Sequence, residues 1–494
     1  MLLVIPIHAN AEDDVAYGAD VGWLSQMESQ GYTWQDTDGT ADDVLDILEA
    51  HGIDSIRLRV FVQPPSNFYW TKNDGTTCIL GYCDTTGLLY MANRANQKGF
   101  RIMIDFHYSD HFADPEYQDV PSQWSSASYN DLVTYVYDYT YYIMNQLANN
   151  GIYPEWVQVG NEINSGILLP YGDSGSYFSQ LAGLLNSGYD AVKAVSPNSK
   201  VITHLANGQN NTVFRWFFDS FLTTYSGKTD VIGMSYYPYW IGDSFENNID
   251  DVVYNLHDMA ERYNKEVMIC EIGGDETEAA ETYELIQAAI DAVYSVPNGK
   301  GIGVFYWEPE ANANVLPDGY PLGMTYQVSS QVLRFTSAIT AFEDSPADIF
   351  PNADRYYKIV NSNSSRALNV TGGSLVNSAN IEQYDYDGWD SQMWQFVDVG
   401  SGYYKIVNKN SGLVLDMSGF STSDGGQCIQ YTYSGGWNQM WSISRTSDGY
   451  CQITNRYSGL VLGISGGSTS DGALCVQGTN TSSDAQKWTI QVVN

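Results

Sequence analysis

The chain has 494 residues, of which 58 are acidic and 22 basic, and its formal net charge is −36 at pH 7. Nucleic acid and anionic membranes repel so negative a protein, which excludes both classes of partner and favours a neutral one. Hydrophobic residues make up 43% and charged residues 16%, as in folded soluble proteins, and the length predicts two or more domains.

The first residues, 1–11, have the pattern of the end of a secretory signal. A short apolar run is followed by Ala9-Asn10-Ala11, an A-x-A cleavage pattern, although the basic residues that usually open a signal are missing. No other apolar segment is long enough to span a bilayer. These features predict a secreted, extracellular protein.

Residues 12–344 alternate short apolar stretches with longer amphipathic ones, which is the pattern of strand–helix units. Helical spacing is clear in 41–48 and 282–289. Eight such units in this length predict an α/β fold of the (β/α)8 TIM-barrel type. A doubly wound sheet is the alternative, but no Gly-rich phosphate turn follows an early strand. The expected strands end at Asp20, Arg59, His107, Glu162, His204, Tyr237, Glu271 and Trp307.

Three of the cysteines lie in this half of the chain. Cys78 and Cys83 flank a short Gly-containing loop, where the spacing permits a local disulfide. Cys270 lies in an apolar run, which favours a buried free thiol. No CxxC pair or His/Cys cluster suggests zinc, so we predict no metal and no cofactor.

Two carboxylates end expected barrel strands. Glu162 closes 157–162 and Glu271 closes 267–271, the fourth and seventh strands. Side chains at the C-terminal ends of barrel strands point into the catalytic mouth, so the two carboxyls can lie ~5–5.5 Å apart, as a retaining glycosidase requires. Either residue alone could equally be a strand-end ion pair. The pair together favours glycoside hydrolysis.

Other strand ends carry the aromatic and polar residues that a sugar site needs. The segments 105–110, 235–240 and 305–309 follow the third, sixth and eighth strands, and Trp307 offers a ring on which a sugar can stack. A Ser-His-Asp site around His107 is a weak rival, because the sequence has no Gly-x-Ser-x-Gly elbow.

The pattern changes after 345–352, which we predict to be a linker. In 353–494 the strands are short, turns are frequent, and three repeats are visible. Trp394, Trp441 and Trp488 each end a Gln-x-Trp motif and are 47 residues apart. One such repeat cannot bury its own apolar face, so three predict an all-β trefoil.

The first half resembles glycoside hydrolase family 53, the arabinogalactan endo-β-1,4-galactanases of the clan A barrels. The resemblance covers essentially the whole first half. It runs through Gly18-Ala19-Asp20-Val21, Arg57-Leu58-Arg59-Val60, Asp105-Phe106-His107-Tyr108-Ser109-Asp110, Ala113-Asp114-Pro115, Gly160-Asn161-Glu162-Ile163-Asn164, Ser235-Tyr236-Tyr237-Pro238-Tyr239-Trp240 and Trp307-Glu308-Pro309.

The resemblance implies roles for individual residues. Glu162 would be the acid/base and Glu271 the nucleophile, which Arg57 and Tyr237 would hold ionised. The choice of Tyr237 over its neighbour Tyr236 rests on strand parity. Other residues implied to contact the sugar are Asn161, at its 2-hydroxyl, together with His107 and Trp307. Two loops depart from the family, at 272–275 and at 310–315, which leaves linkage and cleavage mode open.

The second half resembles ricin-type (ricin B-like) β-trefoil lectin modules, whose signature is Gln-x-Trp. In such modules the sugar contacts are a polar residue after the Leu run, an aromatic residue, and an Asn before the Gln. The second repeat keeps Asp416, Trp437 and Asn438. The first has Asn369, with Tyr384 and Trp389 as aromatic candidates, and the third has Gly463 and Gly478 and is expected to be degenerate.

Together these features predict a retaining endo-hydrolase of β-1,4-galactan, a pectin side chain, with a lectin module that targets the polysaccharide. The expected partner is this polysaccharide, not nucleic acid or a membrane. The alternatives are another clan A glycanase, such as a mannanase or xylanase, and a carbohydrate-binding protein without catalysis.

Overall fold

The structure is a computed structural model and describes residues 15–343, 355–400, 402–446 and 450–493. These residues form two compact units. The first contains 15–293 and 300–343, and the second contains the described residues from 355 onward. Among the described residues, no helix combines the length and the apolar character needed to cross a bilayer.

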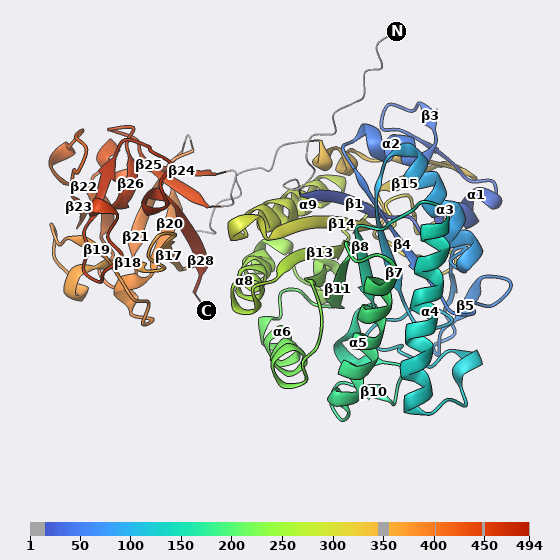
Figure 1. The fold of residues 1–494 in the computed structure, drawn as a ribbon. Helices are drawn as coiled ribbons and strands as arrows, with labels where there is room; N and C mark the ends of the chain where they lie inside the picture. Colours follow the sequence, from blue (N-terminus) through green and yellow to red (C-terminus); the bar gives the residue numbers. More distant parts are fainter. Residues whose placement is uncertain (1–14, 344–354, 401, 447–449, 494) are drawn as a thin grey trace, which may run out of the picture. The chain divides into compact units, whose positions relative to one another are not determined.

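The first unit is a closed barrel of parallel strands with helices on its outside (Figure 1). The barrel strands are β1 (Ala16–Asp20), β4 (Ser55–Val60), β7 (Arg101–Phe106), β8 (Trp156–Val159), β11 (Lys200–Leu205), β12 (Val231–Tyr236), β13 (Glu266–Ile272) and β14 (Gly301–Trp307). The TIM-barrel prediction is therefore confirmed, and each strand ends at or within two or three residues of the expected position.

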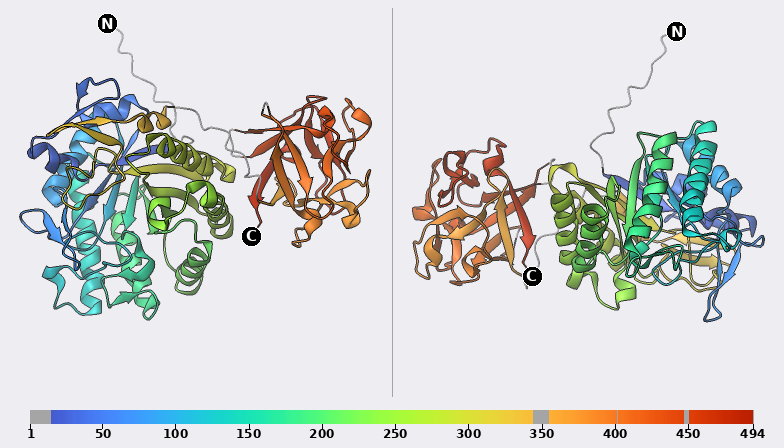
Figure 2. Two further views of the ribbon diagram at one scale, coloured as in Figure 1. Left: turned by 180° about the vertical axis from the view of Figure 1, so that it is seen from behind. Right: turned by 60° about the horizontal axis from the view of Figure 1, so that its bottom comes forward.

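Helices connect successive barrel strands and cover the outside of the barrel (Figure 2). The longer ones are α2 (Val44–Ala50), α3 (Thr85–Lys98), α4 (Tyr129–Asn149), α5 (Phe178–Val195), α6 (Asn211–Phe218), α8 (Phe245–Tyr263) and α9 (Ala279–Tyr294). After β14 the outer element is a 3-10 helix, η5 (Ser337–Phe342). Two short helices, α1 (Leu24–Ser29) and α7 (Pro238–Ile241), lie in loops that follow β1 and β12.

The interior of the barrel is filled by side chains. Its buried apolar core is made of Ala16, Met103, Trp156, Ile202, Val231, Met268, Cys270 and Phe305, each from a barrel strand. This layer fills the barrel below the mouth.

The segments between and after the barrel strands form short additional sheets. Strands β2 (Thr33–Gln35), β3 (Ala41–Asp42), β15 (Thr325–Ser329) and β16 (Val332–Phe335) form one sheet, and β5 (Tyr69–Thr71) and β6 (Thr77–Ile79) form a hairpin. A third pair is β9 (Gly166–Ile167) with β10 (Gly172–Asp173). The helix expected from residue 41 begins at Val44, because the Asp43 side chain caps it by accepting a hydrogen bond from Leu45 N.

The second unit is a β-trefoil of three four-stranded repeats, as the sequence predicts. The strands are β17 (Tyr357–Asn361), β18 (Ala367–Val370), β19 (Ile381–Tyr384) and β20 (Trp394–Asp398), then β21 (Tyr404–Asn408), β22 (Val414–Met417), β23 (Cys428–Tyr431) and β24 (Trp441–Arg445), then β25 (Cys451–Asn455), β26 (Val461–Ile464), β27 (Cys475–Gly478) and β28 (Trp488–Val492). Strand β28 pairs with β17, which closes the ring of repeats.

The Gln-x-Trp tryptophans hold this trefoil together. Trp394, Trp441 and Trp488 are fully buried. Their indole N–H groups donate to the carbonyl oxygens of Leu368, Leu415 and Leu462 at 2.9, 3.1 and 3.1 Å. The same contact recurs in each repeat, so the motif has a structural role and leaves sugar binding to other residues.

Candidate active site and sugar-binding sites

The two candidate catalytic carboxylates come from β8 and β13. Glu162 follows β8 and has a left-handed backbone, with φ of 46° and ψ of 51°. Glu271 lies inside β13, one residue before its end, and is only 6% exposed. Because all barrel strands are parallel, both residues lie at the C-terminal mouth of the barrel.

Two donors hold the Glu271 carboxylate. The Arg57 guanidinium contacts Oε1 at 2.9 Å, and the Tyr237 hydroxyl donates to Oε2 at 3.0 Å. Burial raises the pKa of Glu271 to about 7, while Arg57 and the Tyr237 hydrogen bond act in the opposite direction. Both oxygens are thereby fixed in orientation, as an attacking carboxylate requires.

Of the two carboxyls, Glu162 has the higher pKa and so binds its proton more tightly than Glu271 does. Burial raises its pKa to about 8, and the negative charge of Glu271 acts in the same direction. A hydrogen bond with Ser235 and the charge of Arg57 oppose these effects. Two carboxyls in one enclosed mouth, of which one retains a proton, form the arrangement of an acid beside a nucleophile.

Arg57 lies at the centre of a buried network beneath the mouth. Its Nη1 donates to Asp20 Oδ2 at 2.9 Å, and its Nη2 donates to Asp105 Oδ2 at 2.8 Å and to Asn161 Oδ1 at 2.9 Å. Its side chain is 1% exposed. The acidic neighbours balance the buried guanidinium and fix its direction toward Glu271.

Asn161 and His107 are both tied to Ala113. Asn161 Nδ2 donates to the Ala113 carbonyl oxygen, and Ala113 N donates to His107 Nδ1, each at 2.8 Å. The proton of the His107 ring is therefore on Nε2, which lies 2.8 Å from Asp105 Oδ2. Protein groups occupy both ring nitrogens, so His107 can contact a sugar through its ring and not through a nitrogen.

Trp307 belongs to an aromatic wall at the end of β14. Its ring centroid lies 4.7 Å from those of Trp23 and Tyr320, in edge-on arrangements. The adjacent Glu308 accepts a hydrogen bond from Trp23 N at 3.0 Å and pairs with Arg59. Trp307 is thus held by its neighbours in a fixed orientation, as a stacking surface requires.

The structure adds polar residues that the sequence analysis did not single out. His204 Nε2 lies 2.8 Å from the Ser235 hydroxyl, which in turn hydrogen-bonds Glu162. Burial lowers the pKa of His204 well below its usual range, so this imidazole is neutral. The position of His204 at the end of the fifth expected strand was the sequence signal that could have identified it as a site residue. The sequence carried no such signal for Tyr320, because this residue lies in a long loop after β14.

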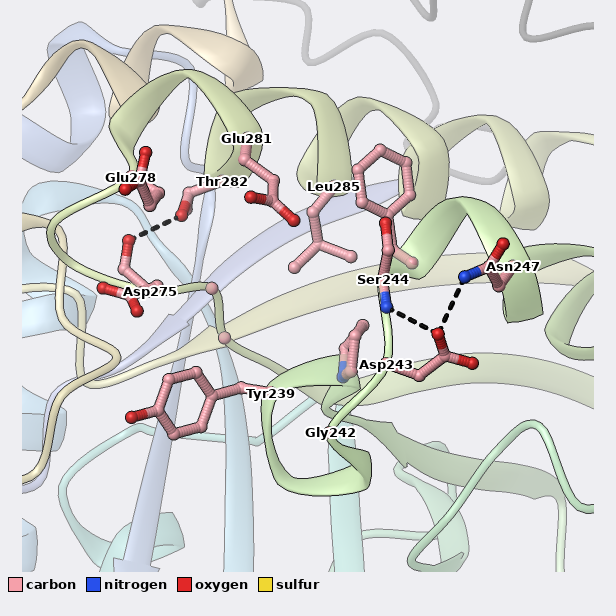
Figure 3. Close-up of a pocket in the computed structure, with 14 residues that line it drawn as sticks. Tyr239, Gly242, Asp243, Ser244, Asn247, Asp275, Glu278, Glu281, Thr282 and Leu285 are labelled. Carbon is pink, nitrogen blue, oxygen red and sulfur yellow. Dashed lines mark hydrogen bonds between the residues drawn. The ribbon is translucent and has the colours of Figure 1, made fainter.

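A pocket of about 460 Å³ opens between the loops that follow β12 and β13 (Figure 3). Asp243 accepts from Ser244 N at 2.9 Å and from Asn247 Nδ2 at 2.7 Å on one side of the pocket. Gly273 and Gly274, two and three residues after Glu271, also line the pocket. The departure from the family at 272–275 therefore directly follows Glu271 and lines this pocket.

The local disulfide that the spacing permits is not formed, and the expected free thiol of Cys270 is confirmed. Cys78 and Cys83 are both free and buried, and Cys83 Sγ contacts the Gly22 carbonyl oxygen at 3.4 Å. Cys78 lies in β6, which pairs with β5, whereas Cys83 lies in the loop beyond it. Cys270 is free and lies in the barrel core.

The first trefoil repeat has a pocket of about 530 Å³ that contains the predicted residues. Asn369, Tyr384 and Trp389 line it, with Asp390, Ser391, Asn410 and Glu382. The rings of Tyr384 and Trp389 lie 5.7 Å apart, and Trp389 is 49% exposed. The sequence analysis missed Glu382, which is buried opposite Asn369.

In the second repeat, Asp416 is held by Asn438 and Gln439. Asn438 Nδ2 lies 3.1 Å from Oδ1, and Gln439 Nε2 lies 2.8 Å from Oδ2. Burial raises the pKa of Asp416 to about 6. Two aromatic residues near Asn438 and Gln439 in the sequence are exposed: Trp437 at 55% and Tyr431 at 41%. The 47-residue period relates Tyr431 to Tyr384, a correspondence that the sequence analysis overlooked.

Comparisons with known proteins agree with these two units. A sequence profile for glycosyl hydrolase family 53 matches residues 16–342, and one described as ricin-type beta-trefoil lectin domain-like matches 349–431 and 437–494. The arabinogalactan endo-beta-1,4-galactanase of Humicola insolens is 32% identical over 321 residues, covering 60% of this chain and 90% of that protein. A probable arabinogalactan endo-beta-1,4-galactanase A of Neosartorya fischeri is 31% identical over 330 residues, covering 62% and 88%.

Solved structures resemble the barrel. A structure from a study of two fungal beta-1,4-galactanases has a TM-score of 0.58 and 28% identity, covering 67% of this chain and all of that one. The family 53 catalytic domain of Ignisphaera aggregans has a TM-score of 0.56 and 30% identity, covering 67% and 95%. With a profile match that takes in every barrel strand, the chain belongs to glycosyl hydrolase family 53.

Proposed function

We propose that this chain hydrolyses internal β-1,4 bonds of galactan with retention of anomeric configuration, and that its trefoil binds the same polysaccharide. Glu162 acts as the acid/base and Glu271 as the nucleophile. The observation that carries the proposal is the clamp on Glu271: Arg57 and Tyr237 fix both of its oxygens at the same barrel mouth as Glu162. The names of the galactanase relatives support the substrate.

The first chemical step forms a glycosyl–enzyme ester. A Glu271 oxygen attacks the anomeric carbon as the glycosidic C–O bond breaks, and protonated Glu162 gives its proton to the leaving oxygen. Arg57 and Tyr237 keep Glu271 ionised before the attack. The raised pKa of Glu162 keeps the required proton on that carboxyl.

The second step releases the sugar. Glu162, now ionised, takes a proton from water, and the resulting hydroxide attacks the anomeric carbon on the face opposite Glu271. The ester bond breaks and Glu271 leaves as carboxylate. Two inversions give net retention. The separation of the two carboxyls, ~5–5.5 Å in retaining enzymes, stays a prediction for this chain.

Secretion is part of the proposal, because a polymeric galactan cannot enter a cell intact and must be cut outside it. The residues that carry the signal-like pattern, 1–11, lie outside the described part of the chain. The predicted boundaries of the domains and the linker, at 12, 344 and 353, also stay predictions.

The test is incubation of the chain with potato galactan beside arabinan, mannan and xylan. We expect galactan to yield short galacto-oligosaccharides, with the β-anomer appearing first by proton NMR. Glu162→Gln and Glu271→Gln should each lower the rate by at least about a thousandfold, whereas Glu284→Gln, an exposed carboxylate on α9, should not change it. Cleavage of mannan or xylan instead, or initial release of the α-anomer, contradicts the proposal.

A further inference from the structure

The three trefoil repeats provide an internal comparison of one pair of facing positions. Asn369 in β18 faces Glu382 in β19. The equivalent pair in the second repeat is Asp416 facing Ile429, and in the third it is Gly463 facing Val476. Facing residues of an antiparallel pair lie on the same side of the sheet, so each pair lies at the same place in its repeat.

The second repeat has its carboxylate on the first strand of the hairpin. Asp416 accepts hydrogen bonds from Asn438 and Gln439, and the facing Ile429 is apolar. The third repeat has no carboxylate at either position and has Gly463 with Val476.

The first repeat has its carboxylate on the second strand of the hairpin. Asn369 Nδ2 donates to Glu382 Oε1 at 3.1 Å, and the Ser391 hydroxyl donates to Asn369 Oδ1 at 2.9 Å. Asn369 thus orients Glu382 and does not replace the carboxylate of Asp416. The chain keeps a carboxylate in this repeat, but it has moved across the strand pair.

Glu382 is held in a position that favours a ligand. Its side chain lies at 8% exposure in the wall of the first-repeat pocket, and no ion pair joins it to a Lys, Arg or His of the described residues. An enclosed carboxylate without a cation is costly unless other donors satisfy it. Sugar hydroxyls are such donors, and the pocket is wide enough for a sugar ring.

The aromatic side of the same pocket can take the apolar face of that ring. Tyr384 and Trp389 both line the pocket with their rings 5.7 Å apart. Gly373 lines the pocket without a side chain, whereas the second repeat has Phe420 at the equivalent position. The two repeats therefore differ both in the origin of the carboxylate and in the space beside it.

We infer that Glu382 is the sugar-binding carboxylate of the first repeat, and that it accepts hydrogen bonds from two neighbouring hydroxyls of a galactose-type unit stacked on Tyr384 and Trp389. The choice of galactose rests on the proposed function, while the site itself rests on the pocket. The trefoil then has two sugar sites of different construction, one built on Glu382 and the other on Asp416.

The test is retardation of the full chain in native gels that contain potato galactan, arabinan, xylan or mannan. All variants carry Glu271→Gln, so that the gel polysaccharide is not digested. Glu382→Gln should weaken affinity about tenfold or more, because a hydrogen-bonded charge is lost. Combining it with Asp416→Asn should weaken affinity further. Asp387→Asn, an exposed carboxylate in the same repeat, is the control and should change nothing.

A rescue variant separates binding from folding. Glu382→Ile should abolish the first site, and adding Asn369→Asp should restore it, because the pair then matches Asp416 with Ile429 of the second repeat. Unchanged retardation with Glu382→Gln overturns the inference, as does failure of the rescue in a chain whose thermal midpoint matches the control.

The same gels separate this inference from the proposed function. If the parent is retained by xylan and not by galactan, and Glu382→Gln weakens that retention, the site stands and the galactan assignment fails. If the wild type cleaves galactan in solution, and galactan gels retain the Glu271→Gln chain equally with and without Glu382→Gln, the site fails and the enzyme assignment stands. A parent chain that none of the four polysaccharides retains also overturns the site.

Discussion

Tyr236 and Tyr237 are adjacent residues with opposite surroundings. The Tyr237 hydroxyl donates to Glu271 at 3.0 Å, whereas the Tyr236 hydroxyl points away from the mouth and contacts Asn248 Oδ1 at 2.6 Å. Successive side chains of a strand lie on opposite faces, which explains the difference. Each tyrosine therefore serves as a control for the other.

Tyr237→Phe should shift the acidic side of the pH–activity profile toward higher pH. The phenol donates to ionised Glu271 and lowers its pKa, so removal of the hydroxyl raises that pKa by about one unit. As the pH falls, Glu271 of the variant is then protonated at a higher pH than in the wild type, and activity is lost at that higher pH. The measurement is kcat/KM against pH, with Tyr236→Phe as the control. Equal acidic limbs for wild type and Tyr237→Phe would show that the hydrogen bond has no role in ionisation.

The alkaline side of the same profile should belong to Glu162. Burial and the charge of Glu271 raise its pKa to about 8, so the proton needed by the leaving oxygen is lost as the pH rises through that value. Glu162→Ala should remove this limb on an aryl galactobioside with an activated leaving group, which needs no acid. In that variant, azide should restore turnover and give the β-glycosyl azide. Formation of the α-azide would instead identify Glu162 as the nucleophile.

At the scale of the element, the end of β13 depends on close packing around Gly273. A Cβ at this position would lie 3.0 Å from Tyr237 Cε1, 3.2 Å from Leu322 Cβ and 3.2 Å from the Tyr320 hydroxyl. The loop after β14 and the end of β12 are thus both packed against Gly273, the residue that follows β13.

Gly273→Ala should lower kcat by about ten- to a hundredfold, because the added methyl group displaces Tyr237 from Glu271. The effect on thermal stability should be small, since the site is at the barrel mouth and outside the core. Gly175→Ala, in an exposed loop with only Asp173 Oδ1 nearby at 3.4 Å, is the matched control. Wild-type kcat in Gly273→Ala would show that this packing does not position Tyr237.

Barrel strands and their ends were predictable from the sequence, whereas loop contacts were not. An apolar run that ends in a titratable residue marks a strand end, and this rule located Glu162 and Glu271. The same rule ended the fifth strand at His204 without assigning that residue to the site. Tyr320 reaches the mouth from a loop whose course has no periodicity. The spacing of Cys78 and Cys83 permitted a disulfide without deciding it, and both thiols are free, with Cys78 in the β5–β6 hairpin and Cys83 in the loop beyond it.

At the scale of the whole molecule, a catalytic barrel and a lectin module share one chain. Linking two binding units converts the second contact into an intramolecular one, so modest sugar sites can still raise retention on a polymer. The 47-residue period was sufficient to predict the trefoil. It was not sufficient to identify Glu382, because that residue is recognised only when cross-strand neighbours are compared between repeats.

Asp416→Asn should weaken retention on insoluble galactan and leave cleavage of soluble oligosaccharides unchanged. Burial raises the pKa of Asp416 to about 6, so in the wild type the second-repeat site should lose its charge, and with it its affinity, as the pH falls through 6. Binding to insoluble polymer between pH 5 and 8 checks this. If the wild type and Asp416→Asn are retained with the same pH dependence, Asp416 is not part of the binding site.

The most direct test of the account is to trap the glycosyl–enzyme with an activated 2-deoxy-2-fluoro-β-galactobioside. The fluorine slows both steps and the activated leaving group speeds the first, so a retaining enzyme accumulates the ester. Peptide mass spectrometry should find the added disaccharide on Glu271, and Tyr237→Phe should label more slowly. Label on Glu162 or on another carboxylate, or inactivation without covalent mass, would contradict the assignment of Glu271 as the nucleophile of a retaining galactanase.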